Sequence, residues 1–216
     1  MWENIPKPWQ LAFVEAWEAY CAGSIPIGAV LADASGEVIR RGRNRIHDRS
    51  APEGQICANK LAHAELNVLL QIGIDESHKL PECTLYATTE PCVLCFGAIV
   101  MARVRRVRYA AADALAGGAD LNRAGNRFVM SRKIDMRCAH GFLAVIQKVL
   151  RTDYLLGLQD KDLAERLLAC ETAEYPDAVE LGRRWHVSGR LQLAREKGMG
   201  IDRVVDELSR EIGHIA

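Results

Sequence analysis

The 216-residue sequence lacks any uncharged apolar run that approaches the roughly 18 residues needed to span a bilayer. Its first residues, Met1 to Pro6, lack the basic-then-apolar order of a secretory signal. It also lacks an excess of charge of either sign, because 28 Lys and Arg balance 28 Asp and Glu, so no global field draws in nucleic acid. We therefore expect a cytoplasmic protein with no membrane partner, in which nucleic-acid binding would require a local basic patch.

The sequence also lacks a regular cysteine framework, internal repeats and low-complexity segments. Its seven cysteines are an odd number at irregular spacing, in a chain large enough to bury a core, which argues against a secreted disulfide scaffold. Hydrophobic residues at 49% and charged residues at 26% are ordinary for a globular protein. We expect a folded chain with reduced thiols, some of which bind a metal.

The hydrophobic pattern predicts alternating helices and strands over the first 158 residues. Helical spacing occurs at residues 8–21, 62–72, 92–102 and 142–150. Strand patterns occur at residues 25–32 and 37–40, which form a predicted hairpin, and at 84–89, 107–111 and 133–138. Residues 112–132 are predicted as a long loop with one helical turn. This order predicts an α/β fold of three layers with a mixed central sheet.

Beyond Leu158 the strand signals disappear and apolar residues follow helical spacing. We predict a first domain over residues 1–157 and a C-terminal helical extension over residues 158–216. The apolar stripes would be exposed if the extension stood alone, so we expect it to pack on the core or on a sister subunit. Residues 189–213 outline a helix-turn-helix, but the second helix has four acidic residues against two arginines, so we predict a packed helical hairpin that does not bind DNA.

Four residues combine metal-binding and proton-transfer chemistry. Cys92 and Cys95 form a Cys-x-x-Cys at a predicted helix start, where the helix dipole favours the thiolates that zinc requires. His63, at the start of another predicted helix, would complete three protein ligands and leave one position open, as in catalytic zinc sites. Zinc lowers the pKa of the water it binds, and a carboxylate that is not a ligand can then carry the proton. Glu65 is the candidate for that role.

A structural zinc site is the alternative interpretation. A Cys-x-x-Cys is often a buried pair or half of a structural site. His78 and Cys83 are then the candidates for a fourth ligand. The cysteines outside the motif are predicted to be small buried hydrophobic residues: Cys21, Cys57, Cys83, Cys138 and Cys170.

The segment His63-Ala64-Glu65, followed by Pro91-Cys92-Val93-Leu94-Cys95, resembles the H-x-E…P-C-x-x-C signature of zinc-dependent nucleobase and nucleoside deaminases. The likeness extends over roughly residues 8–156. Within it, four further segments resemble the branch of bacterial tRNA adenosine deaminase and guanine deaminase: residues 25–30, 42–45, 89–92 and 95–99. The resemblance implies a cytidine-deaminase-like fold, a catalytic domain over residues 1–157, a Zn²⁺ cofactor and a homodimer.

The resemblance also implies roles for single residues. The zinc ligands that it implies are His63, Cys92 and Cys95, and Glu65 is the implied proton shuttle. The substrate contacts that it implies are Asn44, which would hydrogen-bond the substrate, Ile27, which would line the base pocket, and Ala64. For Asn44 the alternative is a cap on a turn, a common role of Asn.

Two departures from the tRNA enzymes bear on the substrate. The loop between Asn44 and His63 is longer than usual, and a helical extension replaces the basic C-terminal tail. From Arg151 onward this chain has more Asp and Glu than Lys and Arg, a balance that repels RNA. We predict hydrolytic deamination of a free nucleobase or nucleoside with release of ammonia. The alternatives are a tRNA adenosine deaminase (A-to-I) and a catalytically inactive, zinc-stabilised interaction module.

Two basic clusters bear on the same choice. The first surrounds Asn44 and contains Arg40, Arg41, Arg43, Arg45 and Arg49. These arginines either meet a substrate phosphate or RNA backbone, or form a solvated face. The second contains Arg103, Arg105, Arg106 and Arg108, whose alternation predicts a solvated edge.

Overall fold

A computed structural model describes residues 1–213 and has a five-stranded sheet at its centre, in the order β2-β1-β3-β4-β5. The strands are β1 (Gly28–Ala32), β2 (Val38–Arg43), β3 (Thr84–Thr89), β4 (Arg106–Ala111) and β5 (Asp135–Cys138). β1 pairs antiparallel with both β2 and β3, whereas β3, β4 and β5 are parallel. The predicted mixed sheet is therefore confirmed, with the hairpin at one side and the parallel strands at the other.

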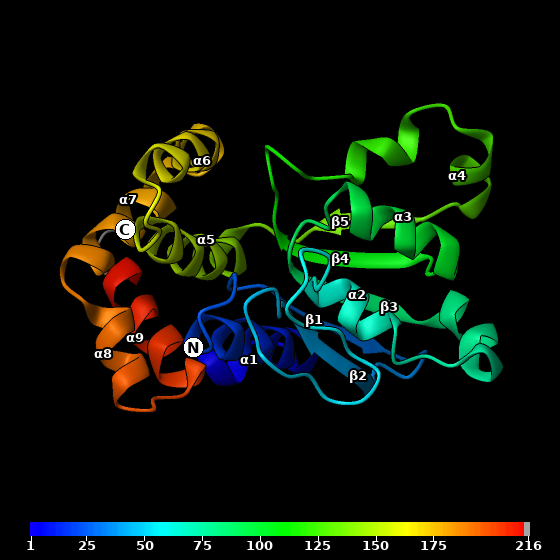
Figure 1. Ribbon diagram of the computed structural model, residues 1–216, viewed down its shortest axis with the longest axis horizontal. Helices are drawn as coiled ribbons and strands as arrows, with labels where there is room; N and C mark the ends of the chain where they lie inside the picture. The colour runs from blue at the N-terminus through cyan, green and yellow to red at the C-terminus, as the bar shows by residue number, and fades with distance from the viewer. Residues whose placement is uncertain (214–216) are drawn as a thin grey trace.

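Helices cover both faces of this sheet and complete three layers (Figure 1). Helices α2 (Ala64–Leu69) and α3 (Val93–Ala102) pack through Val68 and Ile99 onto Leu31 and Leu85 of the sheet. Helices α1 (Lys7–Cys21) and α5 (Gly141–Leu156) cover the opposite face, from which Tyr86 contacts their hydrophobic cluster. Within residues 1–213 no helix combines the length and the apolarity that crossing a membrane requires.

Helix α1 lies directly on the start of β1, and this contact requires Gly28. A Cβ atom built on Gly28 would lie 2.1 Å from the carbonyl oxygen of Ala12 and 2.5 Å from the backbone nitrogen of Ala16. Any larger residue would force the helix away from the strand, since such distances fall far inside van der Waals contact. Phe13 and Trp17 of α1 are buried in the core, as the helical spacing predicts.

Several short elements differ from the sequence-based expectation. The helix expected over residues 62–72 is confined to α2, and the long loop at 112–132 contains more helix than predicted, in η3 (Ala119–Arg123) and α4 (Arg127–Arg132). The 3₁₀ helices η1 (Trp2–Asn4) and η2 (Ile74–Glu82) were not expected. Helix α4 depends on a cap that periodicity does not reveal, because the Asn126 side chain accepts hydrogen bonds from the backbone nitrogens of Phe128 and Val129.

The helical extension comprises α6 (Lys161–Glu174), α7 (Pro176–Val187), α8 (Arg190–Glu196) and α9 (Ile201–Gly213). These helices gather beside α5 at the side of the molecule remote from α4, and the N-terminus lies next to α9 (Figure 1). One hydrophobic cluster joins Phe13 and Trp17 of α1 with Trp185 of α7, Leu191 of α8 and Val205 of α9. The prediction that the extension packs on the core is confirmed, and residues 189–213 pack into that cluster.

The boundary after residue 157 stays a prediction. The shared cluster crosses this position, because Ile146 and Leu150 of α5 belong to it together with the helices of the extension. The last residues of the predicted extension, 214–216, lie outside the described part of the chain.

The prediction of buried cysteines outside the Cys-x-x-Cys motif is wrong for four of the five. Cys83 is buried, but Cys21, Cys57, Cys138 and Cys170 are half-buried. Cys21 is the last residue of α1 and Cys138 the last of β5, so each lies where its element leaves the core. All seven cysteines are free thiols, as expected.

Removal of one large side chain of the extension should destabilise the whole protein. Trp185 is 2% exposed, and its Nε1 donates a hydrogen bond to Glu211 Oε2 at 2.9 Å. We expect Trp185→Ala to lower the free energy of unfolding by about 3–5 kcal/mol, as for other buried aromatic residues. Val187→Ala, two residues away at a side chain that is 87% exposed, should change it by less than about 0.5 kcal/mol.

Chemical denaturation followed by tryptophan fluorescence and circular dichroism measures both variants. Because the cluster crosses from α1 into the extension, the two probes should report a single transition. Separate unfolding of the extension at low denaturant would contradict the single-core interpretation.

Candidate functional site

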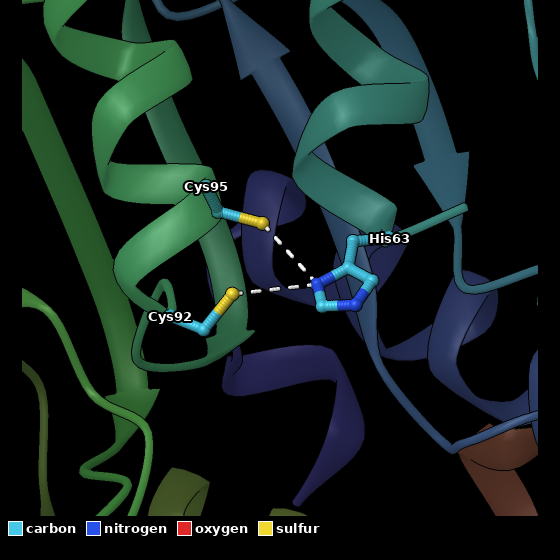
Figure 2. Close-up of side chains that lie close together, drawn as sticks. All are labelled: His63, Cys92 and Cys95. Carbon is cyan, nitrogen blue, oxygen red and sulfur yellow. Dashed lines mark hydrogen bonds between the residues drawn. The ribbon is translucent and has the colours of Figure 1, made fainter. Parts of the chain in front are cut away.

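Two helices begin at the same end of the sheet, and each begins at a potential metal ligand. β3 ends at Thr89, and the chain continues through Pro91 to Cys92, the N-cap residue of α3. His63 is the N-cap residue of α2. Figure 2 shows the His63 ring pointing from the start of α2 toward the first turn of α3, where both sulfurs point back at it. The positive ends of both helix dipoles therefore face the same point.

The ligand atoms of His63, Cys92 and Cys95 converge. His63 Nδ1 lies 3.4 Å from the Sγ of Cys92 and 3.4 Å from the Sγ of Cys95, and all three atoms lie within 4.8 Å of one another. One imidazole nitrogen and two sulfurs form a donor set that suits Zn²⁺. Cys95 is fully buried, whereas His63 and Cys92 are half-buried, so the group is open on one side.

His78 and Cys83, the candidates for a fourth ligand, do not join this group. Cys83 donates a weak hydrogen bond to the carbonyl oxygen of Lys79, and His78 Nδ1 lies 2.8 Å from the carbonyl oxygen of Asp75. Among residues 1–213, His63, Cys92 and Cys95 are the one set of three or more potential ligands close enough to share an ion. A set of three with an open side is the pattern of a catalytic site, whereas structural zinc sites have four protein ligands.

Glu65 lies beside the two sulfurs in the first turn of α2. Glu65 as a whole is 3% exposed, and its Oε2 accepts a hydrogen bond from Cys95 Sγ at 3.3 Å. No Lys or Arg forms an ion pair with it in the part of the chain that the structure describes. The site thus holds a buried carboxylate that is free to exchange a proton.

The environment separates the titrations of these groups. The Cys95 thiol hydrogen bond, together with His63, lowers the pKa of Cys92 to about 4, so Cys92 carries a thiolate. The hydrogen bond to Cys92 and burial both raise the pKa of Cys95. Burial also raises the pKa of Glu65 to about 7, whereas the hydrogen bond with Cys92 raises the pKa of His63. The cluster therefore concentrates negative charge on Cys92 and retains protons nearby.

The structure brings the three expected substrate-contact residues to this end of the sheet. The backbone nitrogen of Asn44 donates to the carbonyl oxygen of Ile27 at 2.9 Å, and the next residue, Arg45, donates to the carbonyl oxygen of Ala62, just before His63. Ala64 is buried at the start of α2, and Ile27 is half-buried beside the same core. Backbone pairing thus aligns these segments next to the metal-ligand group.

Asn44 has the turn-capping role that was one of its two interpretations, and its role in substrate binding stays a prediction. It is 2% exposed, and its Oδ1 accepts a hydrogen bond from the backbone nitrogen of Ile46 at 3.2 Å, so it does cap a turn. Its Nδ2 donates no hydrogen bond to any of the residues that the structure describes. The side chain is therefore held by one amide atom and retains two N–H donors for a ligand.

Glu90 lies in the segment 89–92 that carries the resemblance, but the sequence analysis gave it no role of its own. It precedes Pro91, and its carboxylate accepts hydrogen bonds from the backbone nitrogens of Asp113 (3.2 Å) and Ala119 (2.9 Å). It thereby holds both ends of residues 113–119 against the start of α3. A Cβ atom at Gly117 would lie 2.5 Å from both Glu90 Oε1 and Asp113 O, so this close approach requires glycine. The available signal was a carboxylate next to the Pro-Cys pair.

Asn67 is a second residue that the sequence analysis missed. Its Nδ2 donates to the carbonyl oxygens of Arg43 and Ile56, and its Oδ1 accepts from the backbone nitrogen of Ile56. A single fully buried side chain therefore ties the long loop between Asn44 and His63 to helix α2. Its signal in the sequence was a polar residue four positions after His63, on the apolar face of the helix.

Carboxylates of the chain itself neutralise most of the first arginine cluster. Arg40 pairs with Glu76 and Arg41 with Glu15 at 2.9 Å each, whereas Arg43 and Arg45 both pair with the buried Asp48, at 2.6 and 2.8 Å. Among residues 1–213, Arg49 is the one member without a carboxylate partner. These paired arginines hold the loop next to Asn44 in place, and their ion pairs compete with binding to the successive phosphates of a nucleic acid.

The second cluster matches the predicted edge in part. Arg103 and Arg105 are exposed, but Arg106 and Arg108 are half-buried. Arg108 pairs with Asp135 of β5 at 2.8 Å, and Arg106 donates to the Thr84 side chain and to the carbonyl oxygen of Glu82. These contacts join neighbouring strands far from the metal-ligand group.

Comparison with known proteins places this arrangement in a family. The model of the cytidine and deoxycytidylate deaminase zinc-binding region matches residues 3–111, which contain all the site residues above except those of the 113–119 loop. A tRNA-specific adenosine deaminase of Streptococcus pyogenes serotype M3 is 30% identical over 163 residues, which are 74% of this chain and 88% of the relative.

Solved structures of similar fold include proteins of both kinds described below. A structure from work on A-to-I editing by tRNA deaminases at the wobble position has a TM-score of 0.52 at 30% identity, over 65% of this chain and 96% of that chain. A mutant protein solved in complex with 8-azaguanine has a TM-score of 0.50 at 25% identity, over 69% of this chain and 85% of that chain. The relatives thus include both RNA-directed and purine-binding proteins.

We propose that His63, Cys92 and Cys95 hold one zinc ion per chain, and this assignment predicts the effect of removing one thiolate. Cys92→Ser should lose most of its zinc, because two remaining protein ligands bind the ion too weakly. Elemental analysis of purified protein measures the zinc content. Cys21→Ser is the matched control, since Cys21 is half-buried at the end of α1, and it should keep full occupancy. Full zinc occupancy in Cys92→Ser would contradict the assignment.

Proposed function

The chain belongs to the family of cytidine and deoxycytidylate deaminase zinc-binding domains, and from this premise we propose that it removes the exocyclic amine of a free nucleobase or nucleoside by hydrolysis. Members of this family are zinc-dependent deaminases, so the reaction class and the Zn²⁺ cofactor follow from membership. The substrate and the role of each residue are our proposal.

In this proposal Glu65 is the group that moves protons. When bound, zinc supplies Lewis acidity, which lowers the pKa of a water molecule at the open side of the site. Glu65 is buried next to Cys95 and has no ion-pair partner among the described residues, so its carboxylate is available to accept that proton. It delivers this first proton to the ring nitrogen as the water oxygen bonds to the amine-bearing carbon. It then carries the second water proton to the exocyclic amine, so that the C–N bond breaks and ammonia leaves.

Asn44 orients the base in this proposal. Its Oδ1 is occupied by the Ile46 backbone, so the fixed amide presents its two N–H donors to a carbonyl oxygen or ring nitrogen of the substrate. Ile27 and Ala64, which belong to one hydrophobic cluster, supply apolar contacts in this proposal. The combination of one aimed polar group and small apolar walls suits a flat heterocycle.

The observation that supports a small substrate is the pairing of the arginines around Asn44. RNA binding draws its affinity from cations that neutralise several phosphates. Here Arg40, Arg41, Arg43 and Arg45 are already bound to carboxylates of the chain, and the extension carries more acidic than basic residues. A free base or nucleoside requires no such cations.

A tRNA adenosine deaminase is the second candidate. Similarity to the tRNA-specific relative over 74% of this chain favours it. A zinc-stabilised interaction module without activity, the third interpretation, would bind metal and release no ammonia from any substrate. The homodimer implied by the resemblance stays a prediction.

Replacement of Glu65 by its neutral isostere should abolish proton transfer and leave the fold intact. We expect Glu65→Gln to keep its zinc and its melting temperature while activity falls at least about 100-fold, the usual contribution of a general acid–base group. Elemental analysis and steady-state kinetics measure the two quantities. Glu18→Gln, at an exposed position of α1, should match the wild type. Simultaneous loss of zinc from Glu65→Gln would mean that Glu65 is a ligand.

Two substitutions at Asn44 separate its two roles. Asn44→Asp keeps an acceptor for the Ile46 backbone and removes the amide donor, whereas Asn44→Ala removes both. If the amide binds substrate, both variants should lose roughly 10- to 100-fold in kcat/KM, the cost of one buried hydrogen bond. Unimpaired kcat/KM in Asn44→Asp would leave Asn44 with the turn-capping role alone.

An ammonia-release screen at two salt concentrations tests the substrate class. The panel contains purine and pyrimidine bases, nucleosides, nucleotides and tRNA, each with and without a chelator. We expect turnover of a base or nucleoside at nearly the same rate at 50 and 200 mM salt, whereas a protein that contacts six or more phosphates would lose about 10³-fold in affinity. Deamination of tRNA alone, with that salt dependence, would establish the tRNA alternative. Absence of ammonia release from every compound of the panel would favour the interaction module.

A further inference from the structure

Two side chains, one from α5 and one from the α6–α7 junction, bind the backbone N–H and C=O of Ala112. Its backbone nitrogen donates to the hydroxyl of Tyr175 at 2.9 Å, and its carbonyl oxygen accepts from Lys148 Nζ at 2.7 Å. Ala112 is the first residue after β4, where strand pairing with β3 has ended at Ala111. Hydrogen bonds to side chains therefore replace strand pairing for the backbone of Ala112.

A buried ionic group fixes the position of Lys148. Its side chain is 1% exposed and pairs with the carboxylate of Glu171, whose other oxygen accepts from Arg151 Nε at 2.6 Å. The Lys148 ammonium also lies 4.5 Å from the centre of the Tyr175 ring. Because a buried ammonium requires partners, these contacts confine Lys148 to one position.

From Ala112 the chain leads directly to the backbone around Cys92. The backbone nitrogen of Val93 donates to the carbonyl oxygen of Ala116, Gly118 donates to the carbonyl oxygen of Pro91, and Cys92 and Gly117 form an isolated β-bridge. Glu90 holds both ends of the same segment, at Asp113 and Ala119. Residues 112–119 thus form a strap across the start of α3, with Ala112 as its anchored end.

We propose that Tyr175 and Lys148, with Glu171, are positioning residues that hold this strap and thereby fix the Cys92 sulfur for zinc. The inference rests on the proposed role of Cys92 as a ligand. It assigns to the helical extension a part in the metal site, because Glu171 belongs to α6 and Tyr175 joins α6 to α7. None of the three side chains contacts the metal-ligand atoms, so their effect passes through Ala112 and the strap.

Tyr175→Phe tests the proposal, since it removes the acceptor of the Ala112 N–H, together with the hydroxyl's contact with the Cys138 thiol, and keeps the ring. Tyr154→Phe is the matched control: Tyr154 is half-buried in α5, and its hydroxyl makes no hydrogen bond with the residues described here. The measurements on full-length protein are the rate of zinc release to a chelator, the visible absorption spectrum of the Co²⁺-substituted protein and the melting temperature. The spectrum reports the geometry of thiolate ligands and does not respond to a stability change alone.

We expect Tyr175→Phe to release zinc about 10-fold faster than the wild type and to alter the Co²⁺ spectrum. Substitution of residues that orient metal ligands commonly weakens metal binding by such a factor. Tyr154→Phe should match the wild type in both. The double variant Lys148→Met/Glu171→Gln, which removes both charges of the pair together, should shift both readouts in the same direction. If the double variant fails to fold, Tyr175→Phe alone decides.

An unchanged spectrum and an unchanged zinc release rate in Tyr175→Phe would overturn the proposal. The Cys92→Ser measurement separates this failure from that of the proposed function. Loss of zinc from Cys92→Ser with a wild-type Tyr175→Phe would refute the positioning role alone, whereas retention of zinc in Cys92→Ser would refute the ligand assignment on which it rests.

Discussion

The convergence of two helix N-termini on one point is the constraint on which the rest of this structure depends. His63 and Cys92 are N-cap residues, so the metal-ligand group exists only while α2 and α3 begin at the same end of the sheet. The antiparallel pairing of β1 with β3 brings Ile27 and Asn44 to that end as well. The mixed sheet thereby supplies the ligands from parallel-strand connections and the proposed substrate contacts from the hairpin.

Much of this arrangement could be predicted from local sequence, because its determinants lie close together in the chain. The spacing of His63, Glu65, Cys92 and Cys95 indicated a zinc site, and strands β3 and β4 follow their β-forming residues closely. The contacts that could not be predicted join residues far apart. The partner of Arg41 is Glu15, 26 residues away, and Asn67 bonds to Ile56 and Arg43 across a loop whose path has no pattern. Hydrophobic periodicity predicts which face of an element is buried, but it does not predict which polar groups lie opposite that face.

The arginines beside Asn44 show why such contacts decide function. Read from the sequence, they form a basic patch next to a pocket, which is the footprint of phosphate binding. In the structure Asp48 alone accepts Arg43 and Arg45, and the same carboxylate accepts the Ser24 hydroxyl. These charges stabilise a long loop against helix and sheet. A count of basic residues therefore overstates the attraction of this surface for RNA, because paired charges present little net field to an approaching polyanion.

The hold of Tyr175 on Ala112 has a consequence for the order in which the protein matures. The two residues are 63 positions apart, so a ribosome that adds about 5–20 residues per second delivers Tyr175 roughly 3–13 s after Ala112. During that interval the nascent chain already contains His63, Cys92 and Cys95, but the strap over α3 lacks its distant anchor. If the strap positions Cys92 as proposed, the thiols meet oxidants and competing metals before the site is complete. Completion of the proposed metal centre is then a late event of synthesis, although its ligands are among the first half of the residues made.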